Sequence, residues 1–186
     1  MNKSICTLAL AAAILSLGAS NSQAQNIVMV GGQAMYPAKD IVTNAVNSKD
    51  HTTLVAAVKA AGLVETLQGK GPFTVFAPTN DAFENLPEGT VESLLKPENK
   101  KMLTQVLSYH VVAGRISADQ LVKDIKAGKG KATLKTVSGG SITAMMNGDR
   151  SIVITDEKGG TANISVYDVY QSNGVIHVLD QVLLPN

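Results

Sequence analysis

Cysteine is almost missing from this chain of 186 residues, because Cys6 is the only one in the sequence. It lies within an apolar N-terminal segment that has the pattern of a removable leader. A chain without thiols cannot form disulfides, so its stability must come from a hydrophobic core. The same absence excludes thiolate metal sites, redox catalysis and a cysteine nucleophile in the processed chain.

Long apolar runs are also missing from the sequence, except for one at its N-terminus. That run fits a secretory signal peptide over residues 1–24. Lys3 gives a basic start, an apolar run covers residues 5–17, and the small residues Ser22 and Ala24 fit a cleavage site. A membrane-anchoring helix is the weaker alternative, because the run is short for a membrane span. We therefore expect a periplasmic or extracellular protein with no integral membrane segment after cleavage.

An excess of charge of one sign is missing as well. Formal net charge is +1, and it becomes zero when the leader with Lys3 is removed. This balance argues against nucleic acid as a partner, because such binding depends on many cations that neutralise phosphates. With 45% apolar and 17% charged residues, the composition is that of a globular chain, and we expect a single domain and a monomer.

The order of the sequence patterns predicts an α+β fold. Residues 25–37 are expected to form a flexible lead-in or a loosely added edge strand, and residues 38–186 the folded domain. Helical apolar spacing dominates the first half of that domain. From Ala132 to Leu184 the pattern alternates, with turn signals between runs rich in Val, Ile and Thr, as in antiparallel strands. Helices followed by a strand meander favour α+β over an alternating parallel α/β fold.

Sequence motifs for catalysis and cofactor binding are thin. The chain has neither a G-x-S-x-G elbow nor an HExxH, a phosphate-binding loop or a calcium loop. His51, His110 and His177 have no metal-ligand spacing, and a buried structural role explains His110 and His177 best. Asp180 is close enough in sequence to be a partner of His177. We predict no catalytic residues, no metal and no cofactor.

The stretch GPFTVFAPTNDAF, residues 71–83, joins an apolar strand to a helix. Phe73 and Phe76 belong to the strand, and Pro78 breaks the pattern. Thr79 is well placed to cap the helix that begins at the next residue. A catalytic loop would occupy the same kind of position in an α/β enzyme, but capping is the favoured interpretation.

A cluster of cations is the most distinctive charge feature of the sequence. Within 13 residues, interrupted by a single acid at Asp124, the chain carries Lys123, Lys126, Lys129, Lys131 and Lys135. A solvated face is the ordinary interpretation. The sharper one is a patch that binds acidic polysaccharide or an anionic surface, and such binding would weaken as salt is added.

Three segments together resemble the fasciclin-like domain family. They are GPFTVFAPTNDAF, YHVVAG at residues 109–114 and NGVIHVLDQVLLP at residues 173–185. Their order and spacing follow the family, and the match extends from about Ala38 to Pro185. The chain is most similar to the small, single-domain, exported bacterial members.

This resemblance implies a β-wedge or sandwich of about seven strands, with several helices packed at one end, and a role in adhesion without catalysis. In the family a Tyr-His pair is associated with adhesion and integrin binding, which points to Tyr109 and His110 as partner-binding residues. The remaining signature positions are expected to be structural, and they are Phe73, Phe76, Pro78, Thr79, His177 and Asp180.

Three functional hypotheses follow from the sequence. The first is an exported cell-adhesion or surface-interaction module whose partner is a surface or matrix protein or a polysaccharide. The second is a polyanion binder that uses the lysines of residues 123–135. The third and weakest is a small hydrolase that uses Thr79, Tyr109 or His110.

Overall fold

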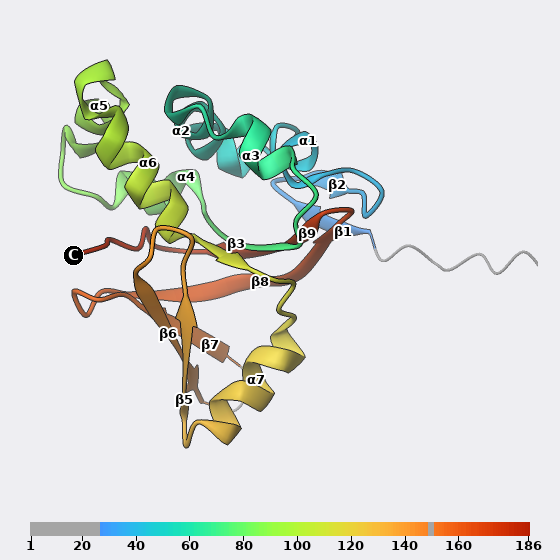
Figure 1. Cartoon of the computed structure of the whole chain (residues 1–186). Coiled ribbons are helices and arrows are strands. Elements are labelled where there is room, and N and C mark those ends of the chain that lie inside the picture. Colours follow the sequence, from blue (N-terminus) through green and yellow to red (C-terminus); the bar gives the residue numbers. More distant parts are fainter. Residues whose placement is uncertain (1–26, 149–150) are drawn as a thin grey trace, which may run out of the picture.

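The structure is a computed structural model that describes residues 27–148 and 151–186. The predicted signal peptide over residues 1–24 lies outside the described residues. Most of the helices gather on one side of a large twisted sheet, and a small N-terminal hairpin lies beside them (Figure 1). Across the described ranges, no helix is both long enough and apolar enough to cross a membrane.

The large sheet has seven strands in the order β4-β3-β9-β8-β7-β6-β5. In chain order they are β3 (Phe73–Pro78), β4 (Val111–Ala113), β5 (Lys131–Lys135), β6 (Ser141–Asn147), β7 (Ser151–Thr155), β8 (Thr161–Gln171) and β9 (Gly174–Leu179). Only β3 and β9 pair in parallel. The two ends of the sheet meet where Val112 bridges Thr136 and the Val137 amide donates to the Val111 carbonyl at 2.8 Å, so the sheet nearly closes into a barrel.

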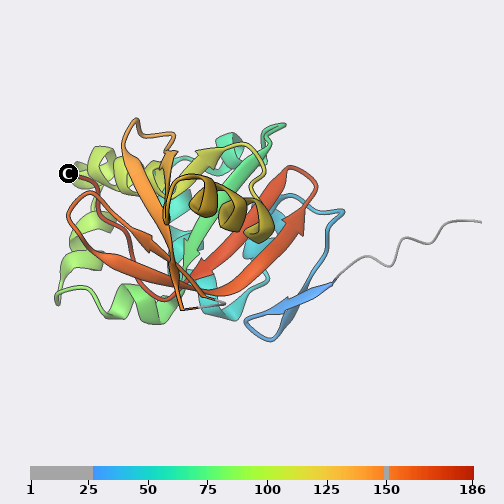
Figure 2. The same cartoon turned by 90° about the horizontal axis from the view of Figure 1, so that it is seen from below.

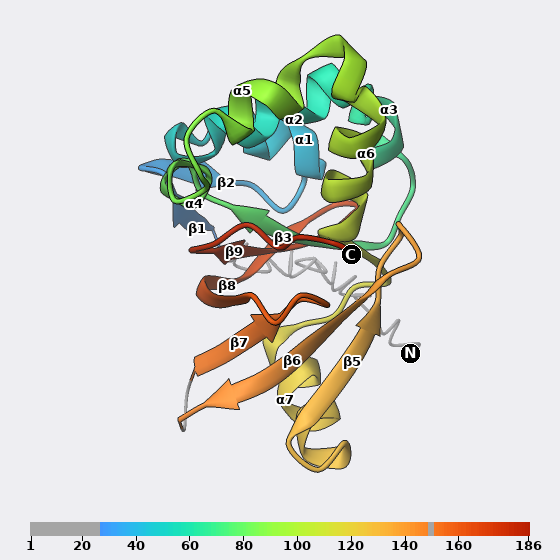
Figure 3. The same ribbon diagram turned by 90° about the vertical axis from the view of Figure 1, so that its left-hand side faces the viewer.

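Helices cover the sheet from two sides (Figures 1 and 3). One layer holds α1 (Ile41–Ala45), α2 (Thr52–Ala61), α3 (Val64–Gln68), α4 (Asn80–Glu84), α5 (Thr90–Leu95), α6 (Lys100–Tyr109) and the 3₁₀ turns η1 (Lys49–His51) and η2 (Pro97–Asn99). The remaining helix, α7 (Ala118–Ala127), packs against β5 and β6 and lies in front of the sheet when the molecule is seen from below (Figure 2). The α+β prediction, with about seven strands and helices at one end, is confirmed.

Two hydrophobic cores follow from this arrangement. The first lies between the helical layer and the sheet, and includes Ile41, Leu54 and Ile176. The second lies inside the curl of the sheet under α7, and includes Leu121 and Ile154. Every second residue of β5 is buried, because successive side chains of a strand point to opposite faces. One face of β5 therefore packs into the second core.

Residues 28–35 form a hairpin, where the sequence predicted a flexible lead-in or a loosely added edge strand over residues 25–37. Strand β1 (Val28–Val30) pairs antiparallel with β2 (Gln33–Met35), in a sheet separate from the large one. An isolated two-stranded ribbon is marginal in water and needs packing against something else. Here Val30 and Met35 supply that packing, because both side chains are buried in the helix-side core.

The two longest signature segments lie about 100 residues apart in sequence and are neighbours in the sheet. Strand β3 runs parallel to β9, from the pair Phe73 and Gly174 to the pair Pro78 and Leu179. A Cβ atom on Gly174 would collide with the Phe73 carbonyl oxygen, so this position requires glycine. The two sequence segments that carry the resemblance therefore contain two neighbouring inner strands of the large sheet.

Asn173 fixes the entry to this strand pair. Its side chain is buried, and Oδ1 accepts a hydrogen bond from the Ile41 amide at 3.0 Å. Its Nδ2 donates to the carbonyls of Leu67 at 2.8 Å and Gly69 at 2.9 Å. One amide group thus joins the start of α1 and the end of α3 to the start of β9.

The loop after β3 is a structural joint, in agreement with the favoured interpretation of its sequence. The Thr79 hydroxyl accepts a hydrogen bond from the Ala82 amide at 3.3 Å and caps α4. The next side chain, Asn80, accepts from the Thr53 amide at 3.0 Å and donates to the Lys49 carbonyl at 2.9 Å. The loop therefore caps its own helix and also holds the beginning of α2.

We expect Asn173→Ala to lower the free energy of unfolding by about 2–4 kcal/mol, because it leaves one buried amide and two carbonyls without their partner. Urea denaturation followed by circular dichroism measures the change. Asn147→Ala is the matched control, since Asn147 is exposed and makes only a long 3.4 Å bond to Asn163. Equal stability of the two variants would contradict the role given to Asn173.

Candidate functional site

Tyr109 ends α6 and is completely buried in the second core. Its hydroxyl donates to the Ser141 carbonyl at 2.7 Å and accepts from the Glu157 amide at 3.1 Å. Burial raises the pKa of Tyr109, so the phenol stays protonated and able to donate. The side chain thereby connects the helical layer to two turns of the strand meander.

His110 follows directly and is also buried. Its Nδ1 lies 2.8 Å from the Val106 carbonyl, and its Nε2 accepts from the Leu183 amide at 3.0 Å. A carbonyl can only accept and an amide can only donate, so the ring is neutral with its proton on Nδ1. Burial lowers the pKa of His110 to about 4, against weaker opposing effects of the Val106 carbonyl and Asp156.

A carboxylate completes the attachment of the C-terminal segment. Asp156 Oδ2 accepts from the Leu184 amide at 3.0 Å, next to the amide that His110 holds. Its Oδ1 accepts from the amides of Lys158 at 2.9 Å and Gly160 at 2.7 Å. One side chain therefore shapes the turn between β7 and β8 and secures the segment after β9.

The structure places the predicted partner-binding pair inside the protein. Every polar side-chain atom of Tyr109 and His110 has a backbone partner, and neither residue exceeds 3% exposure. A partner that docks on the surface of this fold meets neither side chain directly. Their effect on any binding surface would come through the positions of the segments that they hold.

His177 is a second buried histidine, and its partners differ from the expected one. Its Nε2 lies 2.9 Å from the Ile116 carbonyl, and its Nδ1 accepts from the Asp168 amide at 3.3 Å. Asp180, the partner suggested by sequence distance, instead accepts from the Asn163 amide at 2.7 Å and side chain at 2.9 Å. The β-strand explains the correction, because residues three apart point to opposite faces.

The five lysines of residues 123–135 are all exposed. They lie on α7, on the turn after it and on β5, elements that pack side by side. Lys131 and Lys135 share the outward face of β5, which is the last strand in the sheet order (Figure 3). Strand β4 meets this end of the sheet at Thr136 and Val137, and the lysines oppose pairing of the rest of β5 with a strand of another molecule.

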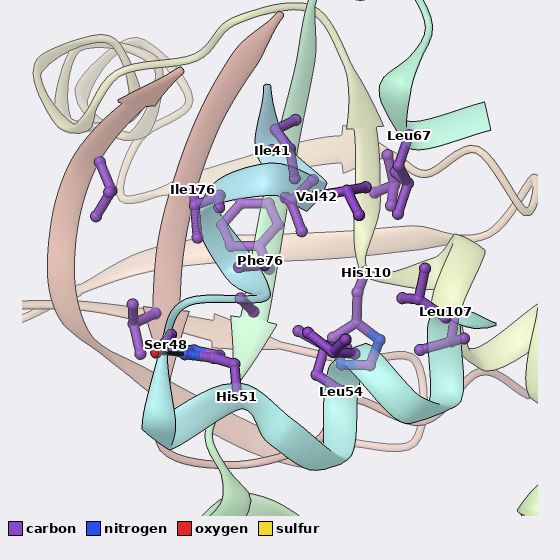
Figure 4. Close-up of a pocket in the computed structure, with 18 of the residues that line it drawn as sticks. Ile41, Val42, Ser48, His51, Leu54, Leu67, Phe76, Leu107, His110 and Ile176 are labelled. Atoms are coloured by element: carbon purple, nitrogen blue, oxygen red, sulfur yellow. Dashed lines mark hydrogen bonds between the residues drawn. The ribbon is translucent and has the colours of Figure 1, made fainter. Parts of the chain in front are cut away.

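A cavity of about 60 Å³ lies between the helical layer and the sheet (Figure 4). Its walls are almost wholly apolar, and they come from the N-terminal hairpin, α1, α2, α3, α6 and the strands β3, β8 and β9. Inside it Ser48 Oγ lies 2.8 Å from His51 Nδ1, while His51 Nε2 has no hydrogen-bond partner among residues 27–148 and 151–186. Burial lowers the pKa of His51, against weaker opposing effects of the Ala77 carbonyl and Asp50.

Sequence reasoning missed this cavity. Its lining residues have the spacing of ordinary core positions on helices and strands, and a sequence pattern does not record how completely two faces fill the space between them. The one available signal was His51 at the start of an apolar helix. Within the described part of the chain, no three side chains of His, Cys, Asp or Glu come together as a metal site.

The architecture defines an α+β domain with a nearly closed seven-stranded sheet, two cores and its signature polar residues held within the fold. The sequence model of the fasciclin domain matches residues 49–185. The chain belongs to the fasciclin domain family.

Relatives from bacteria extend this assignment. The chain is 48% identical over 158 residues to Protein sll1483 of Synechocystis sp., covering 84% of this chain and 79% of that one. It is 31% identical over 180 residues to the cell surface glycolipoprotein MPB83 of Mycobacterium bovis, covering 94% and 74%. It is also 35% identical over 150 residues to the immunogenic protein MPB70 of the same organism, covering 78% and 68%.

A solved structure agrees in fold. It is a FAS1 domain pair from the insect cell adhesion molecule Fasciclin I, with a TM-score of 0.69 and 20% sequence identity. The match covers 80% of this chain and 52% of that one, so this chain spans about half the length of the solved pair.

We expect the free energy of unfolding to fall as the pH drops from about 6.5 to about 4. In this window the unfolded chain binds a proton at His110 that the folded protein does not, so acid favours unfolding, by up to about 3 kcal/mol at this site. The lowered pKa values of His51 and His177 act in the same direction. Urea denaturation at a series of pH values measures the fall.

A His110→Gln variant should lose part of this pH dependence. Direct NMR titration of the three histidine rings in the wild-type protein gives a second measurement that does not depend on the variant folding. A His110 ring that titrates near 6.5 in the folded protein would contradict its neutral, buried state.

Proposed function

We propose that the protein is an exported, non-enzymatic interaction module that binds a protein or polysaccharide on a cell or matrix surface. Membership of the fasciclin family supports this, together with relatives named as a cell surface glycolipoprotein and an immunogenic protein. The leader-like sequence of residues 1–24 supports export. In this proposal the protein acts as a monomer and needs no cofactor.

The observation that carries the proposal is that the polar side chains Thr79, Tyr109 and His110 form hydrogen bonds with the backbone inside the fold. Thr79 caps a helix, Tyr109 holds two turns, and His110 holds the C-terminal segment, so each of the three hydrolase candidates is bonded to backbone. An activated nucleophile requires a base within hydrogen-bond reach, and the neutral His110 has both ring nitrogens engaged. Interaction through the exposed surface accounts for these groups better than catalysis does.

The test compares attachment with and without the protein. Deletion of the gene should reduce surface attachment or aggregation of the cells, and purified protein should restore it in a dose-dependent way. Crosslinking of the purified protein to native envelope material should recover a saturable partner. Unchanged attachment and no saturable partner would reject the proposal, and turnover in a hydrolase screen that is lost in a folded His110→Ala variant would favour an enzyme.

The exposed lysines support a second candidate function, the binding of an acidic polysaccharide or another anionic surface. Lys123, Lys126, Lys129, Lys131 and Lys135 lie on adjoining elements, and Asp124 between them accepts a hydrogen bond from Gln120 at 2.7 Å. Exposed charges of this kind act over about 8 Å at physiological ionic strength. Such binding would be reversible and sensitive to salt.

For this candidate we expect retention on an acidic polysaccharide column that weakens when Lys126, Lys129 and Lys131 are changed to Gln. The elution salt should drop, because fewer cations are available to replace counterions on the polymer. The matched control changes three other exposed lysines to Gln, and they are Lys96, Lys100 and Lys101 of the helical layer. Equal loss in both triple variants would point to net charge alone and reject the patch.

A further inference from the structure

The cavity under the helical layer has the size of a short hydrocarbon chain. One water-sized group needs about 10–15 Å³ in such a cavity, so its volume of about 60 Å³ takes about four to six groups of that size. A methylene group is of similar size. The space therefore suits the tail of a medium-chain molecule better than a single ordered water or a bulky ring system.

The walls of the cavity favour an apolar occupant. Ile41, Val42, Leu54 and Ile176 surround the space and are all buried (Figure 4). The polar groups in the wall are few, and those of Ser48 and His110 are already hydrogen-bonded, which leaves His51 Nε2 as the polar atom of the wall without a partner among the described residues. An ordered water needs two to four polar partners, and such walls cannot provide them along most of the space.

We place the opening of the cavity on its helical side, where several lining residues are in contact with solvent. Most lining residues are buried, but Ala45 of α1, Val55 of α2 and Val64 of α3 are partly exposed. Lys59, one turn after Val55 on α2, also belongs to the lining and is exposed. The opening therefore combines apolar walls with a cation whose charge remains in water.

An apolar interior with a cation at its mouth fits an amphiphile with a negative head. We propose that this cavity binds a medium-chain fatty acid, with about the last four to six carbons of the tail among Ile41, Val42 and Ile176. The remaining carbons lie at the partly exposed opening, and the carboxylate lies beside the Lys59 ammonium. The carboxylate stays hydrated, so it avoids the desolvation cost of a buried charge. The tail fills apolar space without disturbing the Tyr109 and His110 hydrogen bonds. This site is independent of the surface-interaction proposal.

The experiment is a titration of the purified protein with sodium octanoate at pH 7.5, followed by methyl NMR. Contacts between the terminal methyl of ¹³C-labelled octanoate and the methyl groups of Ile41, Val42 and Ile176 should appear in the wild-type protein. The uncharged 1-octanol serves as the second probe, because it has the same tail without the carboxylate. Saturable binding without these contacts, or no saturable binding of octanoate, would overturn the proposal.

Two variants separate tail from head. Val55→Phe should block the partly exposed mouth and weaken the binding of both octanoate and octanol at least tenfold. The thermal midpoint of unfolding of the variant checks that it folds. Lys59→Gln should weaken octanoate about two- to fivefold, the range of an exposed charge pair, and leave octanol unchanged. Lys101→Gln, on α6 outside both the cavity lining and the lysine patch, is the charge-matched control and should change neither.

Each other outcome counts against a stated part of the proposal. Equal weakening of octanoate binding by the Lys59 and Lys101 variants would reject the head-group contact. Unchanged octanoate affinity in a folded Val55→Phe variant would reject entry through this opening. If that variant does not fold, the methyl contacts in the wild-type protein still decide where the tail lies.

Discussion

The domain depends on the two hydrogen bonds that the neutral ring of His110 makes to the backbone. The ring connects the last turn of α6 to the segment after β9, and Asp156 holds the next amide of that segment. These bonds close the fold around strand β9, which lies between β3 and β8. A charged ring at this position could not accept a hydrogen bond from the Leu183 amide. The arrangement therefore requires the lowered pKa that burial gives to His110.

Much of the fold could be predicted from the sequence, because its features follow local rules. The strand at Phe73, the cap at Thr79 and the alternation of the second half each depend on a few neighbouring residues. Sequence-based prediction of the fold failed where the structure of a segment depends on residues far away in the chain. Asn173 finds its partners more than 100 residues away, and the N-terminal hairpin is held by burial that its own sequence does not specify.

The candidate site could be predicted only in part for the same reason. The sequence drew attention to Tyr109 and His110, and resemblance to the family gave them a role, but their burial depends on turns that lie 32 to 73 residues further along. The lysines were easier to interpret, since five charges in 13 residues must be largely exposed. The cavity depends on how two complete layers fit together, which no short motif records.

The place of β9 in the sheet also bears on how the protein is made. Residues 174–179 form an inner strand, yet they are synthesised later than β3 to β8, and β3, which ends at residue 78, has its parallel partner only once they are made. A growing chain therefore cannot join β3 to β8 in the large sheet until β9 is available. Before that point, the helices of the first half have no complete sheet to cover their apolar faces, and this exposed apolar surface favours aggregation.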